Sequence, residues 1–326
     1  MDCGRNTRNP GKGSCIDSLK RVIRQRNLSL QTERTYIHWI ARYGRFCSAR
    51  QLLSTQPESV ERFLNHLSGD LRVAQGTQKV ALNALIFLFR HIYNQQELTL
   101  NFRFSASRVR LPTVLSDKEA RLVLRNLHGV SRLIGALLYG AGLRLTECLS
   151  LRIKDIDFDL KTITVRAGKG DKDRVTLLPG NAITALEKQV KCSRLLYEQD
   201  RLSGLPGVYL PEALARKYPS ASTEFAWYWL FPASKRSIDP RTQIRRRHHY
   251  YPRRFQRAVK LAVSKSAVNK KVSSHTFRHS FATRLLELGY DLRTIQQLLG
   301  HHDVSTTEIY THVIRKGARE VISPLD

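Results

Sequence analysis

The spacing of apolar residues between positions 16 and 100 is the feature that most constrains the fold. Large apolar side chains recur there every three or four positions, for example at Val60, Phe63, Leu64 and Leu67. This period places them on one face of a helix, whereas a half-buried strand would alternate apolar and polar side chains. Such alternation is absent from this region, so we predict a small helical bundle at residues 15–102, preceded by a disordered basic leader at residues 1–14.

Residues 103–112 separate this bundle from a second domain, residues 113–326. The separating segment has no apolar period, carries three arginines and ends in Pro112, which disfavours helix at the residue before it. We predict a basic linker, after which a capping box of Ser116 and Glu119 opens the second domain. The second domain has mostly helical patterns, but residues 162–165 alternate apolar and polar side chains, and residues 175–178 offer a return strand. The expected fold class is therefore mainly α with a small antiparallel β-sheet.

The net charge indicates a polyanionic partner. The chain has 326 residues, with 55 Lys and Arg against 27 Asp and Glu, which gives a formal charge of +28. Globular chains rarely carry so much charge of one sign without such a partner. A solvated basic surface and an RNA-bound scaffold protein are the alternatives. The 41% share of hydrophobic residues argues against a disordered basic chain.

The cysteines and apolar runs indicate a reducing compartment and no membrane association. The chain has five cysteines, without the short spacings of a zinc site or a disulfide framework, and Cys148 is predicted to be a small core residue. The N-terminus is polar and lacks the apolar core of a signal peptide. The most apolar run, residues 84–89, is too short to span a bilayer. We expect a cytoplasmic protein.

The C-terminal region combines histidines with an arginine. His275 and Arg278 lie three positions apart on a predicted helix, so they share a face, and His279 can reach the same site. Asp291 is predicted to cap the next helix, and Gly300 is predicted to end it and to present His301 just beyond it. Arginine can hold two phosphoryl oxygens, and histidine can donate hydrogen bonds or move protons. A His-x-x-Arg pattern taken alone is weak evidence, because it arises by chance in many helices. The alternative role for His301 is that of a C-terminal helix cap.

Tyr310 is the candidate nucleophile. A capping box of Ser305 and Glu308 predicts a helix that carries Tyr310 in its second turn, one tight turn away from His301. A tyrosine hydroxyl can attack a phosphodiester and form a covalent link, which requires neither a metal nor ATP. Considered by itself, Tyr310 could instead be an ordinary structural tyrosine at the edge of the core.

Two upstream cations complete the set. Arg144 follows Gly142, whose missing side chain lets backbone and ligand approach closely, and Glu147 can orient the Arg144 guanidinium. Lys169 lies at the predicted hairpin tip and can protonate a leaving 5′-oxygen. The alternative for Arg144 and Glu147 is a surface ion pair, and the alternative for Lys169 is an exposed side chain without a catalytic role. Two arginines can neutralise a phosphorane-like transition state. We expect no cofactor, because the sequence has neither an acidic cluster nor a Gly-rich nucleotide loop.

In this order and context, these residues resemble those of the tyrosine recombinases, the family of phage-type integrases. The resemblance covers nearly the whole chain and implies a helical core-binding domain, a catalytic domain, and a homotetramer on two DNA sites, with residues 313–326 docked on a neighbour. It also implies a bacterial, nucleoid-associated enzyme. Lys172 is an alternative to Lys169 as the general acid. The six implied catalytic residues are Arg144, Lys169, His275, Arg278, His301 and Tyr310.

Residues 202–250 differ in composition from the rest of the second domain. Aromatic residues at 225–231 precede a segment, residues 235–260, with ten basic residues and one acid. Aromatic side chains beside cations suit unstacked bases, but a hydrophobic mini-core with a basic surface explains the composition equally well.

The same residues resemble the insertion of integron integrases, which grips bases flipped out of a folded single strand. Residues 207–219, the aromatic cluster and the ending at residues 323–325 carry this resemblance. It implies DNA-binding roles for residues matched by position and for the basic run beside them, namely Trp227, Pro240, Arg245, Arg246, Arg247, His248 and His249.

These resemblances together predict a site-specific DNA recombinase of the integron integrase type. It would integrate and excise gene cassettes through a 3′-phosphotyrosyl intermediate, at duplex and folded single-stranded sites. A type IB topoisomerase shares the tyrosine chemistry, but a monomer has no evident use for the residues after Tyr310. A non-enzymatic basic DNA-binding protein is the other alternative, and the intact set of six catalytic residues argues against it.

Overall fold

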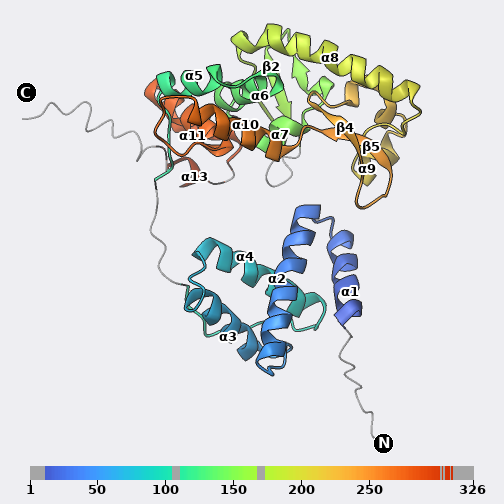
Figure 1. Ribbon diagram of the computed structural model, residues 1–326, viewed down its shortest axis with the longest axis vertical. Coiled ribbons are helices and arrows are strands. Elements are labelled where there is room, and N and C mark those ends of the chain that lie inside the picture. The colour runs from blue at the N-terminus through green and yellow to red at the C-terminus, as the bar shows by residue number, and fades with distance from the viewer. Residues whose placement is uncertain are drawn as a thin grey trace, which may run out of the picture. The chain divides into compact units, whose positions relative to one another are not determined.

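The computed structural model of the chain describes residues 12–104, 111–166, 173–301, 303, 305–308 and 310. The chain divides into two compact units between Val109 and Arg110, inside the predicted linker. Figure 1 shows the elements of each unit. Several predicted features lie outside the described residues: most of the leader, part of the linker, Lys169, Lys172 and residues 313–326.

The first unit is a helical bundle, as predicted. Within residues 12–104, its helices are α1 (Lys12–Gln25), α2 (Leu30–Ala49), α3 (Pro57–Ser68) and α4 (Gln75–His91). The Ser29 hydroxyl caps α2 by accepting a hydrogen bond from the Thr32 N–H at 3.0 Å. The predicted leader extended too far, because α1 already begins at Lys12.

The apolar residues that predicted the bundle form its core. Those of α3 are at most 1% exposed: Val60, Phe63, Leu64 and Leu67. They share one cluster with apolar residues of the neighbouring helices, including Tyr43 and Phe46. The Phe63 ring meets both in T-shaped contacts, with ring centroids 5.5 and 5.2 Å apart. The apolar period and the buried face therefore coincide.

The second unit is mostly helical with two small antiparallel sheets in its described part, so the predicted fold class is confirmed. One sheet has the order β1-β2-β3, and the other pairs β4 with β5. The helices and strands, in chain order, are α5 (Asp117–Arg125), α6 (Gly129–Gly140), α7 (Leu145–Ser150), β1 (Ile156–Asp157), β2 (Thr162–Val165), β3 (Arg174–Leu177), α8 (Ile183–Leu202), α9 (Glu212–Lys217), β4 (Pro232–Ile238), β5 (Arg245–His249), α10 (Pro252–Ser264), α11 (Ser274–Glu287), α12 (Leu292–Leu299) and α13 (Ser305–Glu308).

The centre of the second unit brings distant segments together. α6 packs against α5, α7 and α11, and α12 packs against β3, so the C-terminal helices meet the hairpin strands. Cys148 on α7 is fully buried, as predicted. Of the described helices, none combines the length and the apolar character needed to cross a membrane.

The β2–β3 hairpin was predicted nearly correctly. Val165 pairs with Arg174, and Ile163 pairs with Thr176, in antiparallel register. The return strand begins at Arg174, one residue before the predicted start. This difference matters because Arg174 and Thr176, two residues apart on one strand, point to the same side of the sheet.

The segments around α12 and α13 were predicted with mixed success. Asp291 caps α12 by accepting a hydrogen bond from the Thr294 N–H at 2.9 Å, and Gly300 ends it in the left-handed conformation with φ of 63°. Both features are as predicted. Ser305, however, is the first residue of α13. Tyr310 lies in a turn, where its N–H donates to the Thr307 carbonyl at 3.0 Å, and not in the second turn of that helix.

The predicted insertion, residues 202–250, has a small hydrophobic core of its own. Tyr228 and Trp229 are each 4% exposed, and Val208, Leu210 and Ala221 complete the cluster. Polar groups tie the insertion to α8, because Asp200 near the end of that helix pairs with a buried arginine of β5. Most residues of the aromatic cluster therefore belong to a hydrophobic mini-core, which was the alternative to binding of unstacked bases.

Candidate active site

Arg144 and Glu147 form a tight pair at the start of α7. The Arg144 backbone N–H donates to Glu147 Oε2 at 2.8 Å, and its guanidinium donates to Oε1 at 2.6 Å. Glu147 is in the first turn of the helix, so its carboxylate folds back over the helix start. The prediction that Glu147 orients Arg144 agrees with this geometry, although both side chains are more buried than a surface ion pair would be.

Arg278 approaches the same place from α11 and is only 3% exposed. Its guanidinium donates to the Gly142 carbonyl and to the Leu299 carbonyl, each at 2.6 Å. Burial and the nearby Arg144 lower the pKa of Arg278 to about 9, so it remains charged at neutral pH.

Gly142 has a different role from the one predicted. Its φ is 65°, and a Cβ at this position would lie 2.5 Å from ring atoms of Phe281. The missing side chain therefore makes room for Phe281 of α11 in the core, and the prediction that it makes room for a ligand does not fit this contact.

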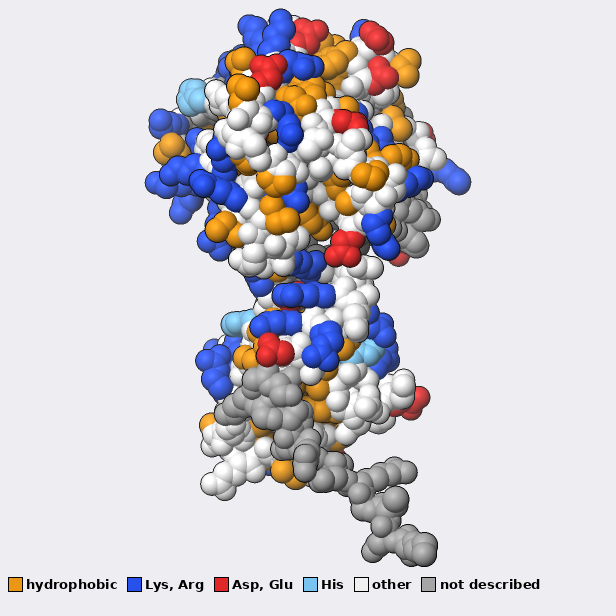
Figure 2. Space-filling view, turned by 90° about the vertical axis from the view of Figure 1, so that its right-hand side faces the viewer, with side chains coloured by type: hydrophobic (Ala, Val, Ile, Leu, Met, Phe, Trp, Pro, Cys, Tyr) orange, Lys and Arg blue, Asp and Glu red, His pale blue; other side chains and the backbone are white. Residues whose placement is uncertain are grey.

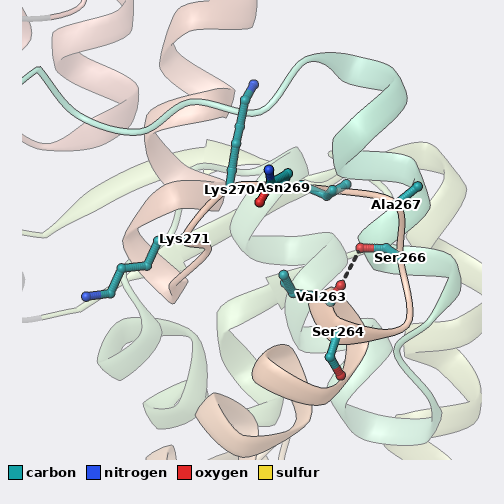
Figure 3. A pocket seen from close by; sticks show the side chains of 8 residues that line it. Val263, Ser264, Ser266, Ala267, Asn269, Lys270 and Lys271 are labelled. Carbon is teal, nitrogen blue, oxygen red and sulfur yellow. Dashed lines mark hydrogen bonds between the residues drawn. The ribbon is translucent and has the colours of Figure 1, made fainter.

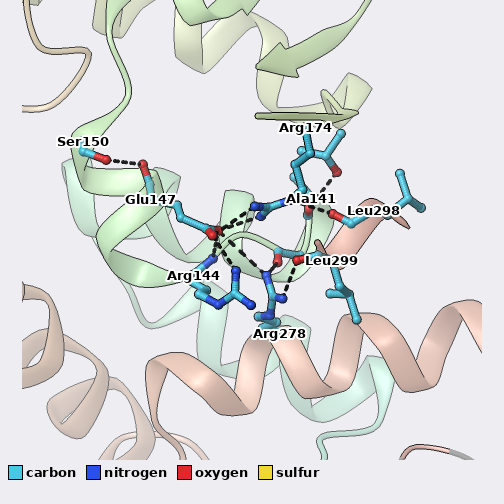
Figure 4. A network of polar contacts seen from close by, with 10 residues as sticks. Ala141, Arg144, Glu147, Ser150, Arg174, Arg278, Leu298 and Leu299 are labelled. Carbon is cyan, nitrogen blue, oxygen red and sulfur yellow. Dashed lines mark hydrogen bonds and ion pairs between the residues drawn. The ribbon is translucent and has the colours of Figure 1, made fainter. Parts of the chain in front are cut away.

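A third arginine, Arg174, completes the cluster and was not among the predicted site residues. It extends from β3 and donates to Glu147 Oε1 at 3.0 Å and to Oε2 at 2.6 Å. Figure 4 shows the Glu147 carboxylate surrounded by the guanidiniums of Arg144, Arg174 and Arg278. The only sequence signal was the position of Arg174 on the strand face that it shares with the buried Thr176.

Burial alone would raise the pKa of Glu147. Hydrogen bonds and charge from Arg174, followed by hydrogen bonds from Arg144, outweigh burial and lower this pKa to about 2. Glu147 is therefore a carboxylate at neutral pH and cannot donate a proton to substrate. Three guanidiniums around one carboxylate leave a surplus of positive charge, which is the arrangement that an anionic ligand requires.

Tyr310 lies beside this cluster, with 1% of its surface exposed. Its hydroxyl is 2.9 Å from His279 Nδ1, and its ring stacks with that of His301 at a centroid distance of 6.3 Å. His301 Nδ1 lies 2.9 Å from the Thr307 hydroxyl. Burial raises the pKa of Tyr310, and Arg278 and Arg144 oppose that increase. The hydroxyl is therefore protonated at neutral pH and needs a base to become a nucleophile.

The histidines around Tyr310 are neutral near pH 7. Burial lowers the pKa of His279 to about 4, with further contributions from His275 and Arg278. Burial, followed by the charges of Arg278 and Arg144, lowers the pKa of His301 to about 3. A neutral imidazole can accept a proton from a hydroxyl. His275, in contrast, is exposed at the start of α11, with its ring 6.3 Å from that of His279.

The seven DNA-binding candidates of the insertion do not share one surface. Pro240 and Arg245 are exposed, and Trp227 is half-buried, with Lys154 Nζ 2.7 Å from its ring centroid. One Arg246 nitrogen donates to the carbonyls of residues 206–208. The insertion elements α9, β4 and β5 lie at the far end of the second unit from α11 and α13 (Figure 1).

Three of these candidates are held by the interior of the insertion. Arg247 is 5% exposed, and its Nε and Nη2 donate to Asp200 at 2.6 and 2.8 Å. Its remaining nitrogen donates to the carbonyls of residues 233 and 234. The prediction that Arg247 binds DNA does not fit this position, because the side chain is buried and each of its three nitrogens already donates to the protein. The His248 ring stacks with Trp229, and His249 Nδ1 contacts the Tyr250 carbonyl.

Elsewhere, the described part of the second unit has an open pocket at residues 263–271 (Figure 3). Lys270 extends from this segment to pair with Glu119 at 2.6 Å. The pocket has no lining residue in common with the cluster around Glu147. Among the described residues, no group of three or more His, Cys, Asp or Glu is arranged to hold a metal ion.

Two parts of the chain match known families. Residues 113–316 match the phage integrase family, and residues 16–97 match the N-terminal SAM-like domain of phage integrases. The chain belongs to the phage integrase family. It is therefore a tyrosine recombinase, an enzyme of site-specific DNA recombination, and the predicted family and enzyme class are confirmed.

Similar proteins span nearly the whole recombinase. It is 45% identical over 316 residues to proteins named integrase/recombinase from Escherichia coli and Pseudomonas aeruginosa, covering 95% of this chain and 93% of each relative. Tyrosine recombinase XerD of Agrobacterium fabrum is 29% identical over 335 residues, with 95% of this chain and 93% of that protein covered.

Two solved structures with less than 25% identity share the fold. The XerH recombinase bound to palindromic difH substrate has a TM-score of 0.60 at 23% identity, with 94% of this chain and 83% of that chain covered. The Tn1549 transposon integrase in complex with transposon right end DNA has a TM-score of 0.59 at 18% identity, with 94% of this chain and 97% of that chain covered.

Acid is expected to destabilise the recombinase through His279. The pKa of this histidine is about 4 in the folded chain against an ordinary value of 6.5. Below pH 6.5 the unfolded chain binds a proton that the folded chain does not, so the free energy of unfolding falls as the pH drops from 6.5 to about 4. The melting temperature of His279→Gln should therefore fall less than that of the wild type between about pH 7 and about pH 5.

The matched control for this measurement is His38→Gln, which changes an exposed histidine of α2. It should follow the wild-type melting temperature at both pH values. If His279→Gln also followed the wild type, protonation of His279 would not be coupled to folding.

Proposed function

We propose that this recombinase is an integron-type integrase in which Tyr310 cuts DNA and forms a 3′-phosphotyrosyl intermediate. The observation that carries the chemistry is the position of the Tyr310 hydroxyl, 2.9 Å from His279 Nδ1 and beside the cluster of Arg144 and Arg278. A nucleophile, a neutral base and two cations are what metal-independent phosphoryl transfer by a tyrosine requires.

In the proposed reaction, the Tyr310 oxygen attacks the scissile phosphorus and its proton passes to a neutral histidine, His279 or His301. Arg144 and Arg278 hold the non-bridging oxygens, and His275, which is exposed, contacts the DNA. The bond from phosphorus to the 5′-oxygen breaks, and Lys169, or Lys172 in the same segment, protonates the leaving oxygen. A 5′-hydroxyl of a partner strand then attacks the phosphotyrosine and releases Tyr310.

Because phosphotyrosine retains the energy of the broken phosphodiester, rejoining needs no ATP. Only 1% of the Tyr310 surface is exposed, so the hydroxyl must become accessible to DNA before it can attack. The net charge of +28 supports DNA as the partner, and Figure 2 shows Lys and Arg side chains across the face in view. The XerH structure contains its difH substrate and the Tn1549 integrase structure contains transposon right end DNA, which supports the same partner.

A suicide substrate tests this chemistry. A DNA site nicked just 3′ of the scissile phosphate releases the short fragment that carries the new 5′-hydroxyl after cleavage, which traps the covalent intermediate. We expect the wild-type chain to form an adduct that withstands denaturing gel electrophoresis, without relaxing supercoiled plasmid. An adduct together with relaxation would favour a type IB topoisomerase-like strand transferase, and no adduct would favour a non-enzymatic DNA-binding protein.

The integron assignment rests on the insertion at residues 202–250. Trp227 is half-buried against its small core, and Pro240 and Arg245 are exposed. Such residues suit extrahelical bases of a folded strand, because aromatic faces stack on bases and cations hold the backbone. The proposed partners are duplex and folded single-stranded recombination sites. Four copies would assemble on two DNA sites in the cytoplasm, on the bacterial nucleoid.

Replacing Trp227 with alanine tests the insertion. We expect recombination of a hairpin site with bulged bases to fall roughly 10- to 100-fold, because stacking contributes about 1–3 kcal/mol per base. Cleavage of a plain duplex site should change little. The conservative variant Trp227→Phe keeps an aromatic face and should retain most of the hairpin activity.

Thermal melting separates this role from a structural one. A Trp227→Ala variant that melts early and loses both activities together would identify Trp227 as a core residue. Unchanged hairpin activity with an unchanged melting temperature would rule out base stacking on Trp227. Lys154 covers part of the ring, so a base must use the remaining face or displace the lysine.

A further inference from the structure

Arg174 connects three separate elements of the second unit. From β3 it holds both oxygens of Glu147 on α7, and its Nε donates to the Leu298 carbonyl of α12 at 3.0 Å. Its side chain is only 9% exposed. Figure 4 shows this guanidinium between the Glu147 carboxylate and the end of α12. A bidentate, buried pair of this kind is strongly oriented.

Arg174 also contacts the segment that leads to His301. Gly300 has a φ of 63°, and a Cβ there would lie 2.7 Å from Arg174 Cδ. The backbone at Gly300 therefore packs directly on the Arg174 side chain, and His301 is the next residue. On the other side, β3 is the return strand of the hairpin that begins with β2. Arg174 thus links the hairpin, the catalytic arginines and the histidine segment.

The charge balance shows why this link matters for an anion. The Arg144 guanidinium lies 2.6 Å and the Arg278 guanidinium 3.8 Å from the Glu147 carboxylate. Without Arg174, the carboxylate would offset one of these two positive charges, and only one would remain uncompensated. With Arg174 present, three positive guanidiniums face one negative carboxylate, and two positive charges remain uncompensated. A phosphoryl transition state with added negative charge benefits from that surplus.

We propose that Arg174 is a positioning residue of the recombination reaction. It neutralises Glu147, which leaves the charges of Arg144 and Arg278 available to the scissile phosphate, and it holds the backbone that presents His301. Arg174 acts through these neighbours and does not itself touch the DNA. This role rests on the proposed function, because it requires that the cluster binds a phosphate during strand cleavage.

The test measures single-turnover cleavage of a nicked substrate that carries either a normal phosphate or an uncharged methylphosphonate at the scissile position. We expect Arg174→Gln to cleave the phosphate substrate roughly 10- to 100-fold more slowly than the wild type, below the full effect of losing a direct donor. Its DNA affinity should be unchanged. The deficit should largely disappear on methylphosphonate, because the transition state then carries less negative charge.

A charge-balanced double variant sharpens the test. Glu147→Gln removes the carboxylate that Arg174 neutralises, so Arg174→Gln with Glu147→Gln should cleave the phosphate substrate faster than Arg174→Gln alone. The matched control is Arg121→Gln on α5, where an exposed arginine pairs with Asp117 at 2.7 Å. It should cleave both substrates at wild-type rates.

The outcomes distinguish the two proposals. An equal deficit of Arg174→Gln on both substrates, with wild-type adduct intact, would overturn the role of Arg174 and leave the proposed function standing. A wild-type chain that forms no adduct on either substrate would overturn the proposed function, and this role with it. If Arg174→Gln melts below the assay temperature, Arg174→Lys decides. It keeps the charge beside Glu147 but loses the fork that also reaches the Leu298 carbonyl, so a wild-type rate on phosphate would overturn the role of Arg174 in holding the backbone that presents His301.

Discussion

The Tyr310→Phe variant is expected to form no covalent DNA adduct and to retain its affinity for DNA. The substitution removes only the hydroxyl oxygen that would attack phosphorus, so the chemical step has no nucleophile. Affinity should stay within about tenfold of the wild type, because one neutral hydrogen bond contributes roughly 1 kcal/mol. Adduct formation on a nicked substrate and fluorescence anisotropy of the uncleaved complex measure the two quantities.

Tyr251→Phe provides the matched control, because Tyr251 is exposed and precedes α10 outside the cluster. This variant should form adduct at the wild-type rate. A Tyr310→Phe chain that still formed adduct would reassign the nucleophile. The next residue to examine would then be Tyr251 or the buried Tyr250, whose hydroxyl lies 3.0 Å from that of Ser131.

Replacing Arg278 is expected to slow cleavage roughly 100- to 1000-fold, the range observed when one donor to a developing oxyanion is removed. The interaction strengthens as the phosphorane forms, so the rate should fall far more than the affinity. Arg278→Lys keeps the charge but loses the planar fork that can hold two oxygens, and it should remain strongly impaired. Single-turnover rates and dissociation constants on the same substrate measure the two effects.

Arg278 also has a structural role, which the experiment must separate from the chemical one. Its guanidinium donates to two backbone carbonyls, at Gly142 and Leu299, so Arg278→Ala leaves both without this donor and should melt earlier. Arg144→Ala is the matched comparison, because the Arg144 guanidinium donates to the Glu147 carboxylate. Equal losses of rate and affinity in both variants would identify the arginines as general phosphate anchors.

Local signals in the sequence predicted most of the helices and several of their ends. The apolar period of α3, the capping box of Ser116 with Glu119, the Asp291 cap and the Gly300 stop all appear in the structure. Each depends on residues within about one or two helical turns of one another, so neighbouring positions contain the needed information. The family resemblance added the candidate catalytic set, which spacing alone could not establish.

The sequence by itself therefore determined the helices, the hairpin and the residue types available for catalysis. Only the tertiary structure decided which of those residues meet. Arg174 reaches Glu147 across 27 positions, Arg247 reaches Asp200 across 47, and Gly142 makes room for a ring of α11. Such contacts depend on how helices and strands pack, and residue spacing does not encode that packing. The basic run at Arg245 to Arg247 shows the consequence, because packing exposes its first residue and buries its last.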